Sequence, residues 1–260
     1  MAIYSGKTKP KAPPRRRRGR PRADTAHAVP ETRVLDLAFQ AFARQGYEGT
    51  TLRALAKELG VSHNLINVRF GTKSSLWRRA VDARVARAAP PVYAALDQAG
   101  VDDETRLKQF IHRFCRWAEE NPELVGLTNV ECRHPSWRLN YIVDGYLLPF
   151  KQRLDALMQR VALNRPLSRL STLALMSLLV QGVGFYFASR PMLERIGAAH
   201  EIEASHLDAQ VTAFAEFILA ALLPAPGSAT PRSGARQSLP RSGGARDEAV
   251  RADDVAVAPA

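Results

Sequence analysis

Apolar residues recur at helical spacing along most of the chain, from about residue 31 to about residue 223. No stretch alternates apolar and polar residues in the manner of a half-buried strand. Proline, glycine and short polar stretches separate the periodic segments, and the pattern predicts helices over residues 31–46, 51–59, 62–70, 73–88, 102–119, 123–132, 136–163, 167–189 and 201–223. Pro149 is expected to bend the long helix 136–163, because proline cannot donate the helical hydrogen bond. The pattern predicts an all-α fold.

Residues 51–70, TLRALAKELGVSHNLINVRF, predict two short helices joined by a tight turn. Thr51 and Ser62 each suit a helix N-terminus, because a hydroxyl accepts a hydrogen bond from a free backbone N–H. Gly60 follows the last apolar position of the first helix, where a left-handed residue ends a helix without Cβ strain. In the second helix the polar residues expected to face outward are His63, Asn64, Asn67 and Arg69. This arrangement is a helix-turn-helix, whose second helix enters the DNA major groove.

Residues 31–80 resemble the DNA-binding domain of the tetracycline-repressor (TetR) family of bacterial transcriptional regulators. The resemblance rests on RQGYEGTT after the first helix, on the LAKELGVS turn and on RFGTKSSLW after the second short helix. The family usually has a small residue and a tyrosine where this chain has Asn64 and Asn67. Because the family tyrosine commonly contacts a phosphate, Asn67 either replaces that contact or reaches a base edge. The resemblance implies a three-helix DNA-binding domain followed by a C-terminal helical bundle for regulation and dimerisation.

Four residues of this domain are expected to lie against the DNA backbone. Thr51 and Arg53, at a helix N-terminus, are expected to contact phosphates, and Arg69 to neutralise one. Ser62, at the start of the second short helix, is also expected to take part in DNA binding. Lys73 resembles the family lysine that reaches a phosphate, and the alternative for it is a plain surface lysine.

The outward face of the second short helix is expected to read the bases. His63, Asn64 and Asn67 face base edges in this geometry, and asparagine is well suited to adenine. The alternative for Asn64 and Asn67 is an exposed helix surface without a partner.

The positive charge is concentrated at the N-terminus. The chain carries a formal charge of +12, and residues 1–22 hold nine basic residues and no acidic one, which leaves only +3 for the rest. We expect residues 1–30 to form a disordered basic arm, since they offer almost nothing to bury. Within this arm Arg18 to Pro21, RGRP, resembles an AT-hook core, so Arg18 and Arg20 are candidates for the narrow minor groove. The alternative is a solvated arm that touches phosphates without sequence preference.

Residues 81–223 are predicted to form the helical ligand-binding and dimerisation domain, and 224–260 a disordered tail rich in Ala, Pro, Ser, Gly and Arg. The family resemblance implies dimerisation through the last two long helices, here 167–189 and 201–223. Gly182 and Gly184 inside the first of them indicate a close helix contact or a bend.

Aromatic residues in this domain have two interpretations. Helical spacing makes core packing the default for Phe110, Phe114, Trp117, Trp137, Tyr141, Tyr146, Phe185 and Tyr186. An all-helical domain of this size can also enclose a pocket for a small apolar effector. The family resemblance favours such a pocket, although the sequence does not assign its lining.

Catalytic and metal-binding chemistry has little support in the sequence. No GxSxG, Walker A, GxGxxG or HExxH motif is present, so we expect no enzyme activity and no cofactor. His112, Cys115, Cys132 and His134 match no usual zinc-site spacing, so no metal is expected. Two cysteines outside any CxxC pair fit a reducing compartment. No secretory signal or membrane span is predicted, which favours a cytoplasmic, nucleoid-associated protein.

The resulting hypothesis is a sequence-specific transcriptional regulator, a ligand-responsive repressor that binds a palindromic operator as a homodimer. The alternative is an architectural protein that uses the basic arm to bind DNA without sequence choice. The operator, the effector, the regulated genes and the choice between repression and activation are left open.

Overall fold

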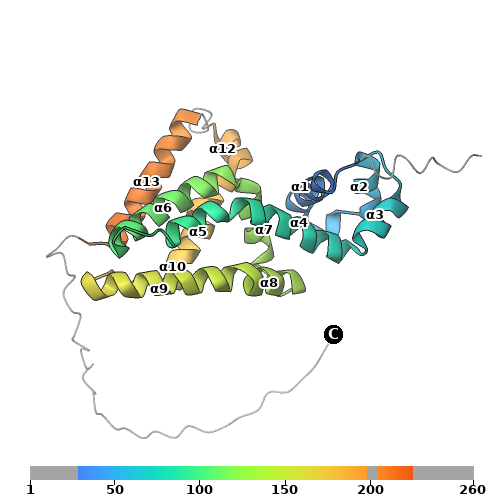
Figure 1. Ribbon diagram of the computed structural model, residues 1–260. Helices are drawn as coiled ribbons and strands as arrows, with labels where there is room; N and C mark the ends of the chain where they lie inside the picture. The colour runs from blue at the N-terminus through green and yellow to red at the C-terminus, as the bar shows by residue number, and fades with distance from the viewer. Residues whose placement is uncertain (1–28, 198–203, 225–260) are drawn as a thin grey trace, which may run out of the picture. The chain divides into compact units, whose positions relative to one another are not determined.

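The computed structural model describes residues 29–197 and 204–224, and these residues form helices joined by short turns, with no strand among them (Figure 1). The predicted all-α fold is confirmed. The basic arm with Arg18 and Arg20, and the tail from residue 225, lie outside the described residues.

The first four helices are α1 (Glu31–Gly49), α2 (Leu52–Glu58), α3 (His63–Phe70) and α4 (Lys73–Ala88). The predicted end of α1 at Gly46 is visible as a break, because this glycine has a φ of 73°. One further turn follows the break and carries the helix to Gly49. Thr50 then leaves the helix in an extended conformation, with its hydroxyl donating to the Gly46 carbonyl.

A buried core unites α1 to α4. Trp77 of α4 is fully buried and packs edge-on against Trp137 and Tyr141, at centroid distances of 5.2 and 5.9 Å. Leu124 and Leu127, from a later helix, belong to the same buried cluster. The helix-turn-helix core is therefore continuous with residues more than 40 positions further along the chain.

The middle of the chain forms α5 (Pro90–Leu96), α6 (Asp103–Glu120), α7 (Pro122–Glu131), α8 (Trp137–Ile142) and α9 (Leu148–Asn164). The helix predicted over residues 73–88 has these bounds as α4, and α5, which the sequence analysis did not predict, begins directly at Pro90. Proline suits the first position of a helix, where its missing N–H would have no intrahelical partner.

The predicted long helix 136–163 is present as α8, a π-helical turn (Val143–Leu147) and α9. The wide turn comes directly before Pro149. Proline cannot donate to the carbonyl four residues earlier, and its ring clashes with that carbonyl. A π-helical turn relieves this conflict by changing the hydrogen-bond register. The expected bend at Pro149 stays a prediction, and what the structure shows beside this proline is the π-helical turn.

The last part forms α10 (Thr172–Ser177), a π-helical turn (Leu178–Val183), α11 (Gly184–Ala188), α12 (Arg190–Ile196) and α13 (Ala204–Leu222). The predicted helix start at residue 167 is wrong, because the first helical residue is Thr172. Ser171 caps it by accepting from the Ala174 N–H at 3.1 Å. The Ser168 N–H instead donates to the Leu222 carbonyl at 3.0 Å, so a tertiary contact replaces helical pairing.

Helix α6 is central to the second core and packs against α5, α9 and α13 (Figure 1). Gly184 shows the close helix approach that its position predicted. A Cβ atom on Gly184 would lie 2.5 Å from Cγ1 of Val125, so α11 and α7 approach more closely than any side chain allows.

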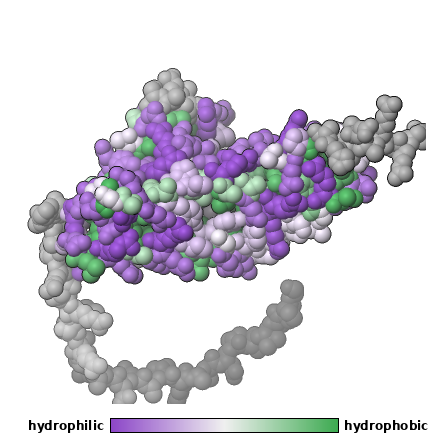
Figure 2. All heavy atoms as spheres, viewed as in Figure 1, coloured by the Kyte–Doolittle hydropathy of each residue, from purple (hydrophilic) through white to green (hydrophobic). Residues whose placement is uncertain are grey.

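The surface and the helix lengths complete this description. The face seen in Figure 2 is mainly hydrophilic, with apolar residues in small patches. Among the described residues no single helix is long and apolar enough to cross a membrane. The segments Thr172–Ala188 and Arg190–Ile196 are long and apolar enough for a membrane span only when they are taken together. The chain bends by 57° between them.

Candidate nucleic-acid interface and apolar cavity

The two short helices are fixed by local hydrogen bonds. The Thr51 hydroxyl accepts from the Ala54 N–H at 3.1 Å, and the Ser62 hydroxyl accepts from the Leu65 N–H at 3.2 Å. Gly60 has a φ of 67° in the turn between them. Both predicted caps and the left-handed turn are confirmed. The two caps and the turn set the orientation of α3, and each was predicted from residues adjacent in the sequence.

One face of α3 is open to solvent, and it carries His63, Asn64, Asn67 and Val68. The Asn67 amide nitrogen lies 3.3 Å from His63 Nδ1, one helical turn away, so these two side chains are paired along one edge. Asn64 and Val68, also one turn apart, form the other edge. Val68 was missed by the sequence analysis although it is 75% exposed, because an apolar residue in an amphipathic helix is read as core.

Arg69 departs from its expected outward position. Its Nη1 donates to the Val29 carbonyl at 2.9 Å, and its guanidinium lies 5.5 Å from the Phe70 ring centroid. Arg79 donates to the Arg69 carbonyl at 3.0 Å and pairs with Glu31. Arg69 therefore ties the chain before α1 to the end of α3.

Lys73 begins α4 and lies beside Tyr47. Its Nζ is 4.3 Å from the Tyr47 ring centroid and 3.5 Å from the Glu48 carbonyl oxygen. Tyr47 in turn stacks on Phe42 and meets Trp137 edge-on at 5.5 Å. The ammonium group is positioned by an aromatic face and a carbonyl, and no carboxylate neutralises it among the described residues. Arg53 lies exposed in the first turn of α2.

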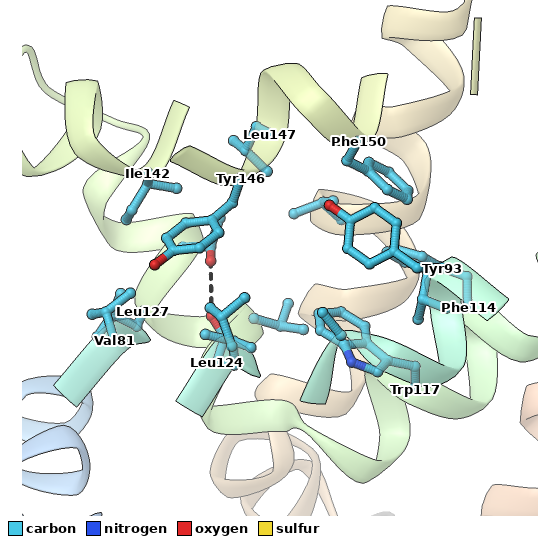
Figure 3. Close-up of a pocket in the computed structure, with 16 residues that line it drawn as sticks. Val81, Tyr93, Phe114, Trp117, Leu124, Leu127, Ile142, Tyr146, Leu147 and Phe150 are labelled. Carbon is cyan, nitrogen blue, oxygen red and sulfur yellow. Dashed lines mark hydrogen bonds between the residues drawn. The ribbon is translucent and has the colours of Figure 1, made fainter. Parts of the chain in front are cut away.

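An apolar cavity of about 100 Å³ lies between α4, α5, α6, α7, α9 and the two π-helical turns (Figure 3). Phe114, Trp117 and Tyr146 of the predicted aromatic set line it, as do Tyr93 and Phe150, which the sequence analysis did not select. The sequence gives no pattern for such a lining, because its members come from elements almost 100 residues apart.

Most polar groups of the lining are already hydrogen-bonded. The Thr128 hydroxyl donates to the Leu124 carbonyl at 2.9 Å, and the Trp117 indole donates to the Ala88 carbonyl at 2.8 Å. The Tyr146 hydroxyl donates to the Asp82 carboxylate. Burial and that hydrogen bond raise the pKa of Tyr146, so it stays neutral at physiological pH.

Helix α4 contributes to both the apolar cavity and the helix-turn-helix region. Its residues Val81 and Val85 line the cavity, while Lys73 lies at its N-terminus beside the helix-turn-helix. Between the two valines, Asp82 accepts hydrogen bonds from Tyr146 and from Tyr141, the latter at 2.7 Å. The carboxylate thus fastens α4 to the segment that forms α8 and the following π-helical turn.

Phe185 contradicts the expectation of core packing. It is 44% exposed, whereas Phe110 and Phe114 are buried in the core around α6. On α13, Phe217 is 67% exposed. Tyr186 and Phe214, their near neighbours in sequence, pack together at 5.2 Å and join α11 to α13. Both helices therefore present an exposed aromatic ring beside a packed contact.

The four Cys and His residues considered as metal ligands do not come together. Within residues 29–197 and 204–224, no group of three His, Cys, Asp or Glu side chains is arranged to hold a metal ion. Cys115 is buried in the core, and burial raises the pKa of its thiol to about 12. It is packed as a small apolar residue.

Comparison with known proteins gives a family for the N-terminal domain. Residues 34–80 match the family model described as "Bacterial regulatory proteins, tetR family". A search of curated protein sequences finds no significant match.

Solved structures match a larger part of the chain. A tetR-family regulatory protein from Rhodococcus RHA1 shares 17% identity over 75% of this chain and 98% of its own, with a TM-score of 0.58. FadR from Bacillus subtilis, solved with stearoyl-CoA, shares 14% identity over 74% and 99%, with a TM-score of 0.55. A TetR/AcrR-family regulator from Thermobifida fusca shares 15% identity over 72% and 95%, with a TM-score of 0.51.

At these identities the structures establish the fold, and the family model establishes the domain that carries α2 and α3. The chain therefore carries a DNA-binding domain of the tetR family over residues 34–80, within a fold that it shares with TetR/AcrR-family regulators.

Proposed function

We propose that this protein is a ligand-responsive repressor that binds a near-palindromic operator as a homodimer in the cytoplasm. The observation that carries the proposal is the double position of α4. Its first residue, Lys73, lies beside the helix-turn-helix, and Val81 and Val85 line the apolar cavity. A change in the cavity therefore acts directly on the helix that leads to the DNA reader.

In this proposal the exposed face of α3 reads base edges. Asn64 and Asn67 offer amide groups that suit adenine, and Val68 offers an apolar surface for a thymine methyl group. His63 completes the face and orients Asn67 through their mutual contact.

Phosphates are contacted around this face. Arg53 is exposed at the start of α2, and Lys73 carries no carboxylate partner among the described residues. Thr51 and Ser62 place helix N-termini, with their partial positive charge, beside the DNA backbone. Arg69 contributes mainly by holding α3 against the chain before α1.

Ligand entry would move α4 through two contacts. Tyr146 lines the cavity and also binds Asp82, so a ligand that displaces its ring disturbs the carboxylate that holds α4. The same carboxylate holds Tyr141, which packs on Trp77 in the core of the DNA-binding domain. Any ligand that binds only one arrangement of these groups shifts the population toward it.

The exposed aromatic rings on α11 and α13 support a homodimer. The outer face of α13 carries Ala209, Ala213 and Ala220 around Phe217. Small residues let two helices approach closely, and a large ring fills the remaining space. One helix contacts only a few base pairs. In a dimer two copies of α3 contact the DNA, so the recognised sequence is longer and the binding is tighter.

Selection of bound fragments from a random DNA pool tests the proposal. We expect an inverted repeat with half-sites about 10 base pairs apart or a multiple of it, bound by two copies of the chain. Phe217→Glu should weaken the dimer in sedimentation and the operator affinity with it, while Leu163→Glu, at an exposed site on α9, serves as control. Equal binding to all fragments would instead support an architectural role.

A further inference from the structure

The cavity is small for a binding site. Small-molecule sites usually enclose about 300–1,000 Å³, whereas this cavity has about 100 Å³. An engineered apolar cavity of about 150 Å³ accepts benzene. The space therefore suits a molecule about the size of one aromatic ring, without rearrangement of the surrounding helices.

The lining carries no charged side chain among the residues that the structure describes. Asp82 lies behind Tyr146 and is occupied by two tyrosine hydroxyls. Arg153 does not line the cavity. It lies over the Tyr93 ring at 4.7 Å, and its charge is paired with Asp97 at 2.6 Å. A charged ligand would lose its hydration in the cavity without gaining an ion pair, which disfavours its binding.

One polar group of the lining remains available. Figure 3 shows the Tyr93 hydroxyl directed toward the centre of the cavity, and no described residue accepts or donates a hydrogen bond there. The other polar side chains, Thr128, Trp117 and Tyr146, are bonded to protein acceptors. Phe150 meets the Tyr93 ring edge-on at 6.3 Å, on the side of the ring that α9 covers.

The ionisation state of Tyr93 follows from its surroundings. Burial raises the pKa of its hydroxyl above the ordinary value, so the group remains a neutral donor and acceptor at physiological pH. The hydroxyl has no hydrogen-bond partner among the described residues, and a ligand that covers it without offering one would leave it unsatisfied. The open hydroxyl therefore favours a ligand that brings one hydrogen-bonding group to this point.

We infer that the effector is a compact, uncharged and mainly apolar molecule with one polar group bound by the Tyr93 hydroxyl. This inference rests on the proposed function, in which the cavity is the effector site. It separates the ligand class from an acyl thioester of a long fatty acid, which exceeds the cavity in size and carries anionic groups.

Four probes of equal ring size test the inference by calorimetric titration of the full chain: toluene, p-cresol, benzoate and protonated benzylamine. We expect p-cresol to bind about two- to tenfold more tightly than toluene, as for one added hydrogen bond. Benzoate and benzylamine should bind more than about 100-fold more weakly than toluene, because of their desolvation.

Two kinds of variant locate the site. Tyr93→Phe should remove the preference for p-cresol over toluene while toluene binding persists. Val180→Phe and Ala89→Leu, which fill the lining from two different elements, should abolish binding of both probes. Circular dichroism and the melting temperature identify any variant that fails to fold, and the second filling variant then replaces the first.

The inference is overturned if benzoate or benzylamine binds as tightly as toluene, if the p-cresol preference survives Tyr93→Phe, or if no probe binds at millimolar concentration. Operator affinity is measured separately with p-cresol bound. Binding with the expected pattern but no change in operator affinity would support the ligand class and contradict the proposed coupling to DNA.

Discussion

The DNA reader and the apolar cavity are built in opposite ways. The reader lies within residues 51–73, where two hydroxyl caps and one left-handed glycine fix the geometry locally. The cavity is lined from Val81 to Val180, by side chains that meet only after most helices have packed. The reader therefore places its function on exposed residues of a short segment, whereas the cavity depends on the entire arrangement of the core.

This contrast has an energetic side. Residues such as Asn64 and Val68 are exposed, so their replacement should change DNA recognition and leave the folding free energy nearly unaffected. Residues around the cavity are also core residues, so changes there affect binding and stability together. Helix α4 belongs to both groups, and the proposed coupling between the cavity and the DNA reader rests on this position.

Trp77→Ala should have the largest effect, because it removes a fully buried indole that joins α4 to α8. We expect a loss of about 3–5 kcal/mol in the free energy of unfolding, measured by urea denaturation. Val68→Ala is the control and should change this free energy by less than about 0.5 kcal/mol. If Trp77→Ala cost less than about 0.5 kcal/mol, as an ordinary surface substitution does, Trp77 would not hold α4 and α8 together.

Gly184→Ala should destabilise the protein by about 1–3 kcal/mol, because overpacking forces buried side chains to move. The new Cβ would lie 2.5 Å from Val125 Cγ1. Gly126→Ala is a matched control on α7, where the Cβ would meet Ala188 at an ordinary 3.8 Å. It should stabilise the helix by about 0.5–1 kcal/mol. Opposite signs in thermal unfolding would support the close contact, and equal signs would contradict it.

Asn64→Ala should leave the melting temperature unchanged and relax specificity at one base position by about 1–3 kcal/mol. The measurement is the affinity for a set of operators that each carry one substituted base pair. Arg53→Ala, expected to remove a phosphate contact, should instead weaken binding to all of them by a similar factor. If Asn64→Ala weakened binding uniformly as well, the residue would not read a base.

Asp36→Asn should have the smallest effect, because the ion pair of Asp36 with Arg87 joins α1 and α4 at an exposed site. The hydrogen bond from Arg87 lowers the pKa of Asp36 in the folded state. The pair therefore stabilises the fold above about pH 4 and ceases to do so as the pH falls through the lowered pKa. At pH 7 we expect a loss below about 1 kcal/mol in urea unfolding, and a smaller difference at pH 3. An equal difference at both pH values would exclude the ion pair as its cause.

The sequence predicted what local chemistry determines. The caps at Thr51 and Ser62 and the turn at Gly60 were readable, because each depends on neighbouring residues. Periodicity also gave most helices of the core, with boundaries within a few residues for most of them, but it missed α5.

Several of the failures involve contacts between distant residues. The Ser168 N–H pairs with Leu222, which delays the helix predicted from 167. Arg69 turns toward Val29, and Phe185 faces outward, although helical spacing alone favoured the opposite for both. Periodicity distinguishes a buried face from an exposed one, but it cannot distinguish a face that packs within one chain from a face left for a partner.

The most direct test of the account is the affinity ratio between the selected operator and random DNA, measured at about 0.15 M salt for the full chain and for Asn64→Ala/Asn67→Ala. The account predicts a ratio above about 1,000 for the unmodified chain and a large drop for the double variant, which should keep the same melting temperature. A ratio near one, or a ratio that the double variant leaves unchanged, would contradict the assignment of α3 as the sequence reader.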